Sequence, residues 1–170
     1  MPKGLKQTSS TIVIGASVTE SAANTFTQER IDLQLNPLDN EVFVVTAINL
    51  DLASPDAIAA TNTQTRGSLS TTSLTSFGTL SQSQVLAVSR EDIRAAGFVD
   101  GGVGFSQTSM ETPPAALDYV GIIATNDFFL QVVGVNNAAA KSMGVKVYGY
   151  RARAEASTYA ALVQSEVLSS

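Results

Sequence analysis

The side chains that most often carry out catalysis are missing from this chain. Its 170 residues include no histidine and no cysteine, which excludes thiolate nucleophiles, thiolate metal sites and the usual serine triads. Carboxylates remain, at Asp51 and Asp56, at Glu91 and Asp92, and at Asp100. A glycosidase needs two carboxylates across a cleft, and such a cleft normally carries aromatic side chains, which are scarce here. We interpret the carboxylates as caps and solvated loop residues, and expect no enzyme and no catalytic residue.

A glycine-rich stretch at residues 101–104 also suggests ligand binding. It does not follow the GxGxxG pattern, and no Lys-Ser or Lys-Thr pair follows it, as a phosphate-binding P-loop requires. No DxDxDG loop for calcium accompanies the neighbouring Asp100. We interpret the stretch as a plain loop, and expect no cofactor and no metal.

Positive charge concentrates near the C-terminus. Lys141, Lys146, Arg151 and Arg153 follow one another with no acidic residue among them. The two arginines continue the apolar face of a predicted strand at residues 143–154. Because a buried, unpaired guanidinium is costly, we expect the strand to leave the core and the arginines to reach acids or water. Three interpretations stay open: contact with a neighbouring subunit, a solvated strand end, and contact with lipid or nucleic acid.

Two tyrosines precede these arginines at alternate positions. Tyr148 and Tyr150 stand on either side of Gly149. Exposed tyrosines on an edge strand often anchor an interface, and a role in the core is equally compatible with the pattern. Together with Arg151 and Arg153, the tyrosines form the candidate subunit interface.

The overall charge argues against nucleic-acid binding. The net charge is −5 and the isoelectric point is near 4.6, whereas a protein that coats phosphates is basic in at least one arm. The N-terminus offers only Lys3 and Lys6. No run approaches the roughly 18 apolar residues of a membrane span, and the run at 12–14 is too short for a signal peptide. Direct nucleic-acid contact is therefore not expected, and membrane contact is not indicated.

Three strands are predicted in the first part of the chain. Apolar and polar residues alternate over 11–20 and again over 25–35, which is typical of half-buried strands. A turn cluster at 36–40 precedes residues 41–52, which are apolar on both faces and predict a central strand covered on both sides. Short connections between such strands favour an antiparallel all-β fold.

The middle of the chain is rich in serine and threonine. Residues 61–84 carry one charge, Arg66, and 13 of these 24 residues are serine or threonine. Two interpretations stay open, an excursion between strands and a disordered segment. We favour the excursion, which a neighbouring subunit can help to order, because the segment lacks the high charge and the proline typical of disorder. Residues 84–88 can form a short strand. Ser89 and the acids that follow it predict a short helix over 90–96.

Regular patterns return near the C-terminus. Residues 117–124 and 128–135 are apolar runs separated by turn residues, which predicts a hairpin. Residues 143–154 form the last long strand, and apolar residues at helical spacing over 156–168 predict a C-terminal helix. Neither a repeat nor a domain boundary interrupts the chain, so residues 1–170 are expected to form one domain.

The order of these last elements resembles a known family. The stretch from Leu117 to Val132, the turn Asn136-Asn137 and the segment from Val145 to Arg153 are similar to the C-terminal half of single jelly-roll capsid proteins from small tailless viruses. The resemblance implies an antiparallel sandwich that assembles into trimers or pentamers of a shell. It places the protein in the virion, assembled in the host cytoplasm beside other virion proteins. The chain departs from the family in lacking a basic arm and in its serine- and threonine-rich insertion.

Composition favours the same interpretation. Serine, threonine, asparagine and glutamine supply 53 residues, and only 15% of the chain is charged against a usual ~25%. Interface cores are depleted in charge, so this composition suits a homo-oligomer. We expect an all-β fold, an antiparallel β-sandwich of the jelly-roll type with one short internal helix and a short C-terminal helix. The expected function is a structural virion protein, in the first place a self-assembling major capsid protein. The alternatives are a virion decoration, spike-base or tail accessory protein, and a carbohydrate- or ligand-binding β-sandwich.

Overall fold

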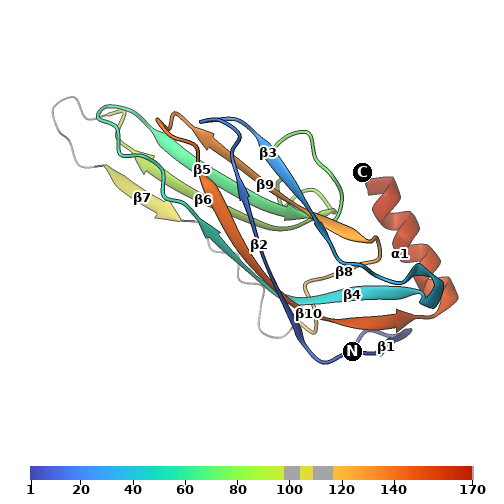
Figure 1. Cartoon of the computed structure of the whole chain (residues 1–170). Helices are drawn as coiled ribbons and strands as arrows, with labels where there is room; N and C mark the ends of the chain where they lie inside the picture. The colour runs from blue at the N-terminus through green and yellow to red at the C-terminus, as the bar shows by residue number, and fades with distance from the viewer. Residues whose placement is uncertain (98–103, 109–116, 170) are drawn as a thin grey trace.

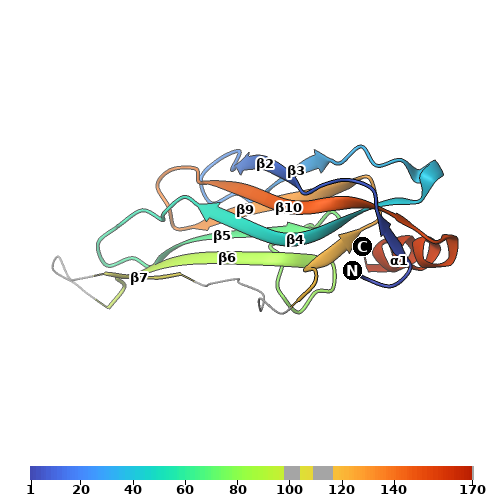
Figure 2. The same ribbon diagram turned by 90° about the horizontal axis from the view of Figure 1, so that it is seen from below.

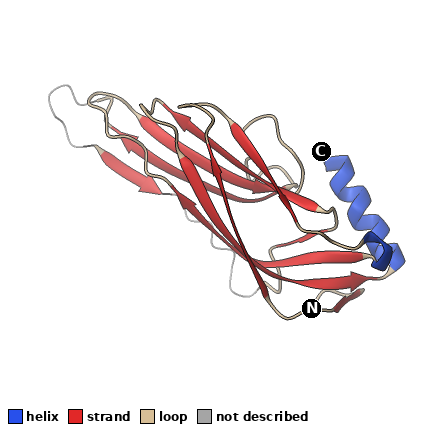
Figure 3. Ribbon diagram, in the orientation of Figure 1, coloured by secondary structure: helices blue, strands red, loops and turns tan. Residues whose placement is uncertain are grey.

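The chain folds into two antiparallel sheets that pack face to face, with a helix at one end (Figure 1). The computed structural model describes residues 1–97, 104–108 and 117–169, so Asp100 and residues 101–103 of the predicted loop lie outside the described residues. The strands are β1 (Leu5–Gln7), β2 (Ile12–Thr19), β3 (Thr27–Asp32), β4 (Glu41–Leu52), β5 (Thr63–Ser70), β6 (Val85–Arg94), β7 (Phe105–Thr108), β8 (Gly121–Ile123), β9 (Asp127–Val135) and β10 (Ser142–Ala154). A 3-10 helix η1 (Pro37–Asp39) precedes β4, and helix α1 (Ala156–Ser169) follows β10. The predicted all-β sandwich is confirmed (Figure 3).

The first sheet is built around β10. Strand β4 lies along one edge of β10, and β8 pairs with the far edge of β4. The other edge of β10 carries β2 along residues 142–149 and β1 along residues 152–154. The register between β10 and β4 shifts between Tyr148 and Gly149. This bulge divides β10 into a half that faces the second sheet and a half that extends toward α1.

The second sheet has the order β3-β9-β5-β6-β7, with every pair antiparallel. Strands β9 and β5 occupy its middle, and β3 and β7 form its edges. Figure 2 shows the two sheets as layers seen from the side, with β2 and β3 next to each other.

Two apolar clusters explain why β4 is apolar on both faces. Phe43 and Val45 face the second sheet and join the main core between the sheets. Val42 and Val44 face the opposite side and join a second cluster under α1. All four side chains are almost completely buried. The prediction of a strand over 41–52 is therefore confirmed. Cover on both sides is confirmed for residues 42–45, where the second cover is the helix, but not for the rest of the strand, where Ala47, Asn49 and Asp51 are exposed.

Helix α1 confirms the predicted C-terminal helix. Its Tyr159, Leu162 and Val163 pack on the outer face of the first sheet, over the end of β10. Both chain termini lie at this end of the sandwich (Figures 1 and 2). Among the helices of the described residues, none is long and apolar enough to cross a bilayer.

The prediction of a helix over residues 90–96 is wrong. Strand β6 continues to Arg94, pairing with β5 on one side and with β7 on the other. Asp92 does not cap a helix: it is buried in the strand and accepts a hydrogen bond from Gln64 on β5. Pairing on both edges outweighs the local capping preference of Ser89, because tertiary context overrides propensity.

Residues 61–84 are not one continuous excursion. Their first part forms β5, a central strand in which Ser68 and Ser70 are fully buried. Gln131 on β9 satisfies both hydroxyls, since Ser68 Oγ donates to its Oε1 (2.8 Å) and its Nε2 donates to Ser70 Oγ (2.7 Å). Residues 71–84 form the connection to β6. Strand β5 is thus held by neighbouring strands of its own chain.

The prediction that residues 117–135 form a hairpin is wrong, because its two strands do not pair with each other. Strand β8 pairs with β4 in the first sheet, whereas β9 pairs with β3 and β5 in the second. The turn residues between them therefore form a corner that crosses between the sheets. Glu166 of α1 stabilises this corner by accepting hydrogen bonds from the backbone N–H groups of Ala124 (2.8 Å) and Thr125 (2.9 Å).

Candidate functional site

The four predicted interface residues lie on both sides of the bulge in β10, with Tyr148 before it and the other three after it, and they occupy different environments. Tyr148 lies on the outer face of the first sheet, between Val13 on β2 and Ala47 on β4. Tyr150 packs with the apolar cluster under α1. Burial, with a smaller contribution from the Asp118 carboxylate, raises the pKa of the Tyr150 hydroxyl above its ordinary value. Tyr150 therefore has a core role, and Tyr148 remains accessible from outside.

Arg151 is held by the connection between β3 and β4 of its own chain. Its Nη1 donates to Glu41 Oε2 (2.9 Å) and to the Gln34 carbonyl oxygen (3.1 Å), and its Nη2 donates to the Leu33 carbonyl oxygen (2.9 Å). The side chain is half-buried. The guanidinium thereby fastens this connection to β10.

Arg153 makes a more exposed contact with the same connection. Its Nη2 lies 2.7 Å from Asp39 Oδ1, and both side chains are more than half exposed. The sequence did not identify Asp39 or Glu41 as partners, because the turn at 36–40 returns to β10 only in the folded chain. A contact between subunits at the four predicted residues stays a prediction.

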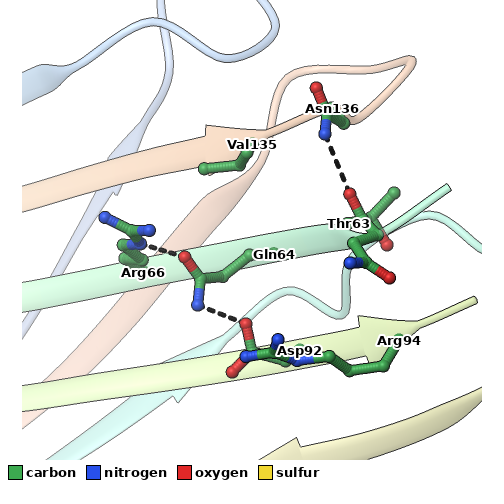
Figure 4. A pocket seen from close by; sticks show the side chains of 8 residues that line it. Thr63, Gln64, Arg66, Asp92, Arg94, Val135 and Asn136 are labelled. Carbon is green, nitrogen blue, oxygen red and sulfur yellow. Dashed lines mark hydrogen bonds between the residues drawn. The ribbon is translucent and has the colours of Figure 1, made fainter. Parts of the chain in front are cut away.

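A second cluster of arginines, which the sequence analysis missed, lies on the outer face of the second sheet. Arg66 on β5 is directly opposite Arg90 on β6. Because side chains alternate along a strand, Arg94 lies on the same face as Arg90. Two of these arginines line a pocket of about 180 Å³, whose full lining is Asn62, Thr63, Gln64, Arg66, Asp92, Arg94, Val135 and Asn136 (Figure 4).

Gln64 organises this pocket. Its Oε1 accepts a hydrogen bond from Arg66 Nε, and its Nε2 donates to Asp92 Oδ1, so the three side chains form the chain of contacts drawn in Figure 4. The ring of Phe77 covers the guanidinium of Arg66, whose Cζ is 5.7 Å from the ring centre. Burial and the opposed Arg90 lower the pKa of Arg66 from its ordinary value. The Arg66 side chain is therefore held in position before any ligand arrives.

Two arginines, Arg66 and Arg94, and one carboxylate, Asp92, line the pocket, so its lining carries a surplus of one positive charge. Among the described residues, no carboxylate forms an ion pair with Arg66, Arg90 or Arg94. Like charges directly opposite each other on neighbouring strands destabilise a sheet, and guanidinium groups bind carboxylates and phosphates through paired donors. The arrangement suits a small oxyanion. The sequence analysis missed this cluster because it predicted a helix over 90–96. A strand at these residues would have placed Arg90 and Arg94 on one face.

Three carboxylates, buried at Glu20 and Glu166 and half-buried at Asp56, serve the fold. Glu20 accepts hydrogen bonds from the backbone N–H groups of Gly134 (2.6 Å) and Lys141 (2.8 Å). Asp56 pairs with Lys141 Nζ (2.6 Å), and this contact lowers the pKa of its carboxyl group. In Glu166, burial outweighs the two backbone hydrogen bonds and raises the pKa. The described part of the chain contains no cluster of three or more metal-ligating side chains.

No protein-family model matches the chain, and no curated protein matches it.

Proposed function

We propose that this protein is a structural protein of a virion whose jelly-roll subunit assembles with copies of itself into a shell. The pairing of eight strands supports the proposal. Strand β2 pairs with β10, β3 with β9, β4 with β8, and β5 with β6. These are the pairs of one long hairpin folded back on itself, which on wrapping yields the two Greek keys of a jelly roll.

Wrapping this long hairpin into a jelly roll requires two further strand pairings. Strand β10 lies next to β4, and β9 lies next to β5. The eight strands therefore divide into β2-β10-β4-β8 and β3-β9-β5-β6, with β1 and β7 added at the edges. Viral capsid proteins are one of the main classes that use the jelly roll, and the resemblance over residues 117–153 points to the same class.

Uncharged surfaces also support self-assembly. The only charged residue of α1, Glu166, is buried, whereas Val167 and Leu168 are 59% and 76% exposed. Leu38 in η1, at the same end of the sandwich, is 93% exposed. Exposed apolar surface marks interaction sites, and here the exposed Arg153–Asp39 ion pair borders it next to Leu38. This end of the subunit is therefore suited to contact another subunit.

Assembly of the purified chain tests the proposal. Light scattering after size-exclusion chromatography measures the oligomer, and negative-stain electron microscopy shows its form. We expect ordered rings, sheets or shells at physiological salt. A chain that stays monomeric at every concentration contradicts the proposal. Small closed oligomers without shells would instead indicate a decoration, spike-base or tail accessory protein.

The arginine pocket favours a second candidate, a ligand-binding β-sandwich whose ligand is a small oxyanion. Phosphate is a suitable probe, and at a hundredfold excess over its dissociation constant it should add about 2.7 kcal/mol to the stability. Arg94→Gln should abolish this gain. Arg30→Gln is the matched control, because Arg30 lies on the same sheet and is paired with Asp127 at 2.6 Å. If phosphate does not raise the stability of the parent chain, the pocket is not a phosphate site.

A further inference from the structure

The edge of β2 differs from the other long edge beside it. Among the described strands β2 pairs with β10 alone, and residues 7–19 contain neither a charge nor a proline. Strand β3, which lies next to β2 across the sandwich (Figure 2), carries Glu29, Arg30 and Asp32. Proteins normally protect an exposed strand edge with charges, proline or a bulge. Strand β3 has this protection and β2 does not.

Hydrogen bonds at the end of β2 show which of its backbone groups point to the free edge. The carbonyl oxygen of Ser142 on β10 accepts from the N–H of Ala53 (2.9 Å), so it points toward β4 and away from β2. Ser142 is in register with Thr19, which makes this pair non-hydrogen-bonded. The next pair is hydrogen-bonded, since Glu20 N–H donates to the Lys141 carbonyl oxygen (2.9 Å). Antiparallel pairs alternate between these two types, so the odd-numbered residues of β2 present their backbone groups to the edge.

The result is a row of available backbone donors and acceptors. The N–H and carbonyl groups of Val13, Gly15 and Ser17 point away from β10, and no described residue pairs with them. Val13 is also 53% exposed. A Cβ atom at Gly15 would meet nothing within 4 Å, and this glycine has no positive φ. Nothing within the chain therefore requires glycine there, and a glycine inside a strand often marks the approach of another backbone.

We propose that β2 pairs with β2 of a second copy of this chain, antiparallel, across a two-fold axis at Gly15. Val13 then lies opposite Ser17 of the partner subunit, and Gly15 lies opposite Gly15 of the partner subunit. Residues with outward-pointing backbone groups face each other throughout, so every edge N–H meets a carbonyl. The missing side chain at Gly15 leaves space for the diagonally adjacent Val13. The pairing joins the first sheets of two subunits, and it rests on the proposed function in naming one contact of the assembly.

Charge favours a second copy over a partner of another kind. Two copies of a chain with a net charge of −5 repel each other over most of their surfaces. Strand β2 carries no charge, so two copies can approach along its edge without bringing like charges on β2 together. A two-fold contact must be complementary to itself. A neutral antiparallel strand meets this condition, whereas a charged peptide would find no opposite charge along β2.

The absence of cysteine allows a clean cross-linking test. Gly15→Cys introduces one thiol per chain at the axis, where Cα atoms of a hydrogen-bonded pair are ~5.5 Å apart, within the range of a disulfide. We expect a disulfide-linked dimer under mild oxidation. Ser17→Cys on the same face is the control: its two thiols would be ~13 Å apart along the strands, so no dimer should form. The double variant Val13→Cys, Ser17→Cys restores the cross-link.

A second pair of variants tests the same contact without oxidation. Gly15→Lys places two ammonium groups opposite each other, which should weaken self-association about tenfold in sedimentation experiments. Gly15→Ser adds a side chain of neutral charge and should leave it unchanged. Because the space above Gly15 is open, Gly15→Ser should melt as the parent subunit does. Gly15→Lys should melt slightly lower, since residue 15 is in register with Lys146 of β10, so its self-association is measured well below its melting temperature.

The outcomes separate the pairing from the proposed function. The pairing is overturned if Gly15→Cys and Ser17→Cys cross-link equally, or if neither of them cross-links. Particles that form while Gly15→Cys stays unlinked overturn the pairing and leave the proposed function standing. A linked Gly15→Cys dimer that forms no larger assembly supports the pairing and contradicts the proposed function.

Discussion

Replacing Arg151 by lysine separates its role in the subunit from a role between subunits. The guanidinium makes three hydrogen bonds, one to Glu41 and two to the carbonyl oxygens of Leu33 and Gln34. Lysine keeps the charge and can keep the bond to Glu41, but it lacks the planar fork that reaches both carbonyls. Each lost bond contributes about 1 kcal/mol. Arg151→Lys should therefore lower the free energy of unfolding by about 2 kcal/mol.

Arg153→Lys is the matched control on the same strand. The ion pair with Asp39 joins side chains that are 58% and 52% exposed, and an exposed pair contributes about 0–1 kcal/mol. A domain of this size changes its melting temperature by about 2–4 °C for each kcal/mol. The melting temperature of Arg151→Lys should fall by about 4–8 °C and that of Arg153→Lys by no more than about 2–4 °C.

Calorimetry of the dilute, unassembled subunit at pH 7 measures both variants. Equal melting shifts for the two would refute the assignment of Arg151 to the connection between β3 and β4. Unchanged melting combined with lost assembly would instead assign Arg151 to a subunit interface. Glu41→Gln, alone and combined with Arg151→Lys, completes a double-mutant cycle that isolates the ion pair from the carbonyl contacts.

Two other predictions concern Glu166 and Gly149. Because burial raises the pKa of Glu166 above its ordinary 4.5, the folded chain holds this proton more tightly than the unfolded chain, so stability should fall as the pH rises from about 4.5 through the raised pKa. Melting curves across this range should show the decline, and Glu166→Gln should remove it; an identical profile in the variant contradicts the assignment. A Cβ at Gly149 would collide with the Val44 carbonyl oxygen and the Phe43 ring, so Gly149→Ala should cost about 1–3 kcal/mol. Gly144→Ala, whose Cβ would have ordinary contacts at 3.8 Å, is the control, and equal unfolding midpoints for the two would count against the collision.

The long elements were predictable because their patterns are local. Residues 41–52 match β4 at both ends, and residues 143–154 match β10 to within one residue. A strand that is apolar on both faces must be covered on both sides wherever it lies in the fold. The C-terminal helix was predictable for the same reason, since its apolar residues recur at helical spacing whatever they pack against.

Strand partners were not predictable because they depend on residues far apart in sequence. The runs at 117–124 and 128–135 look like a hairpin, but each pairs with a strand from the first half of the chain. Glu166 helps to decide this outcome, since it binds the corner between the two runs from 41 residues away. The arginine pocket was missed for a related reason, because Arg66 and Arg90 meet only through the pairing of β5 with β6.

Neutral polar residues are used inside this subunit, which limits what composition indicates about assembly. Ser68, Ser70 and Gln131 are fully buried and hydrogen-bonded to one another on the second sheet. Abundant serine and glutamine can thus build a polar layer within one chain as readily as a contact between chains.

Self-assembly is better indicated by particular surfaces that lack charge, namely the edge of β2 and the exposed side of α1. These surfaces differ in kind: the edge offers backbone groups that require a strand in fixed register, whereas the helix offers side chains that tolerate several packings. A charge placed on β2 should therefore block one defined contact, and a charge on α1 should weaken association without changing the register of the strands.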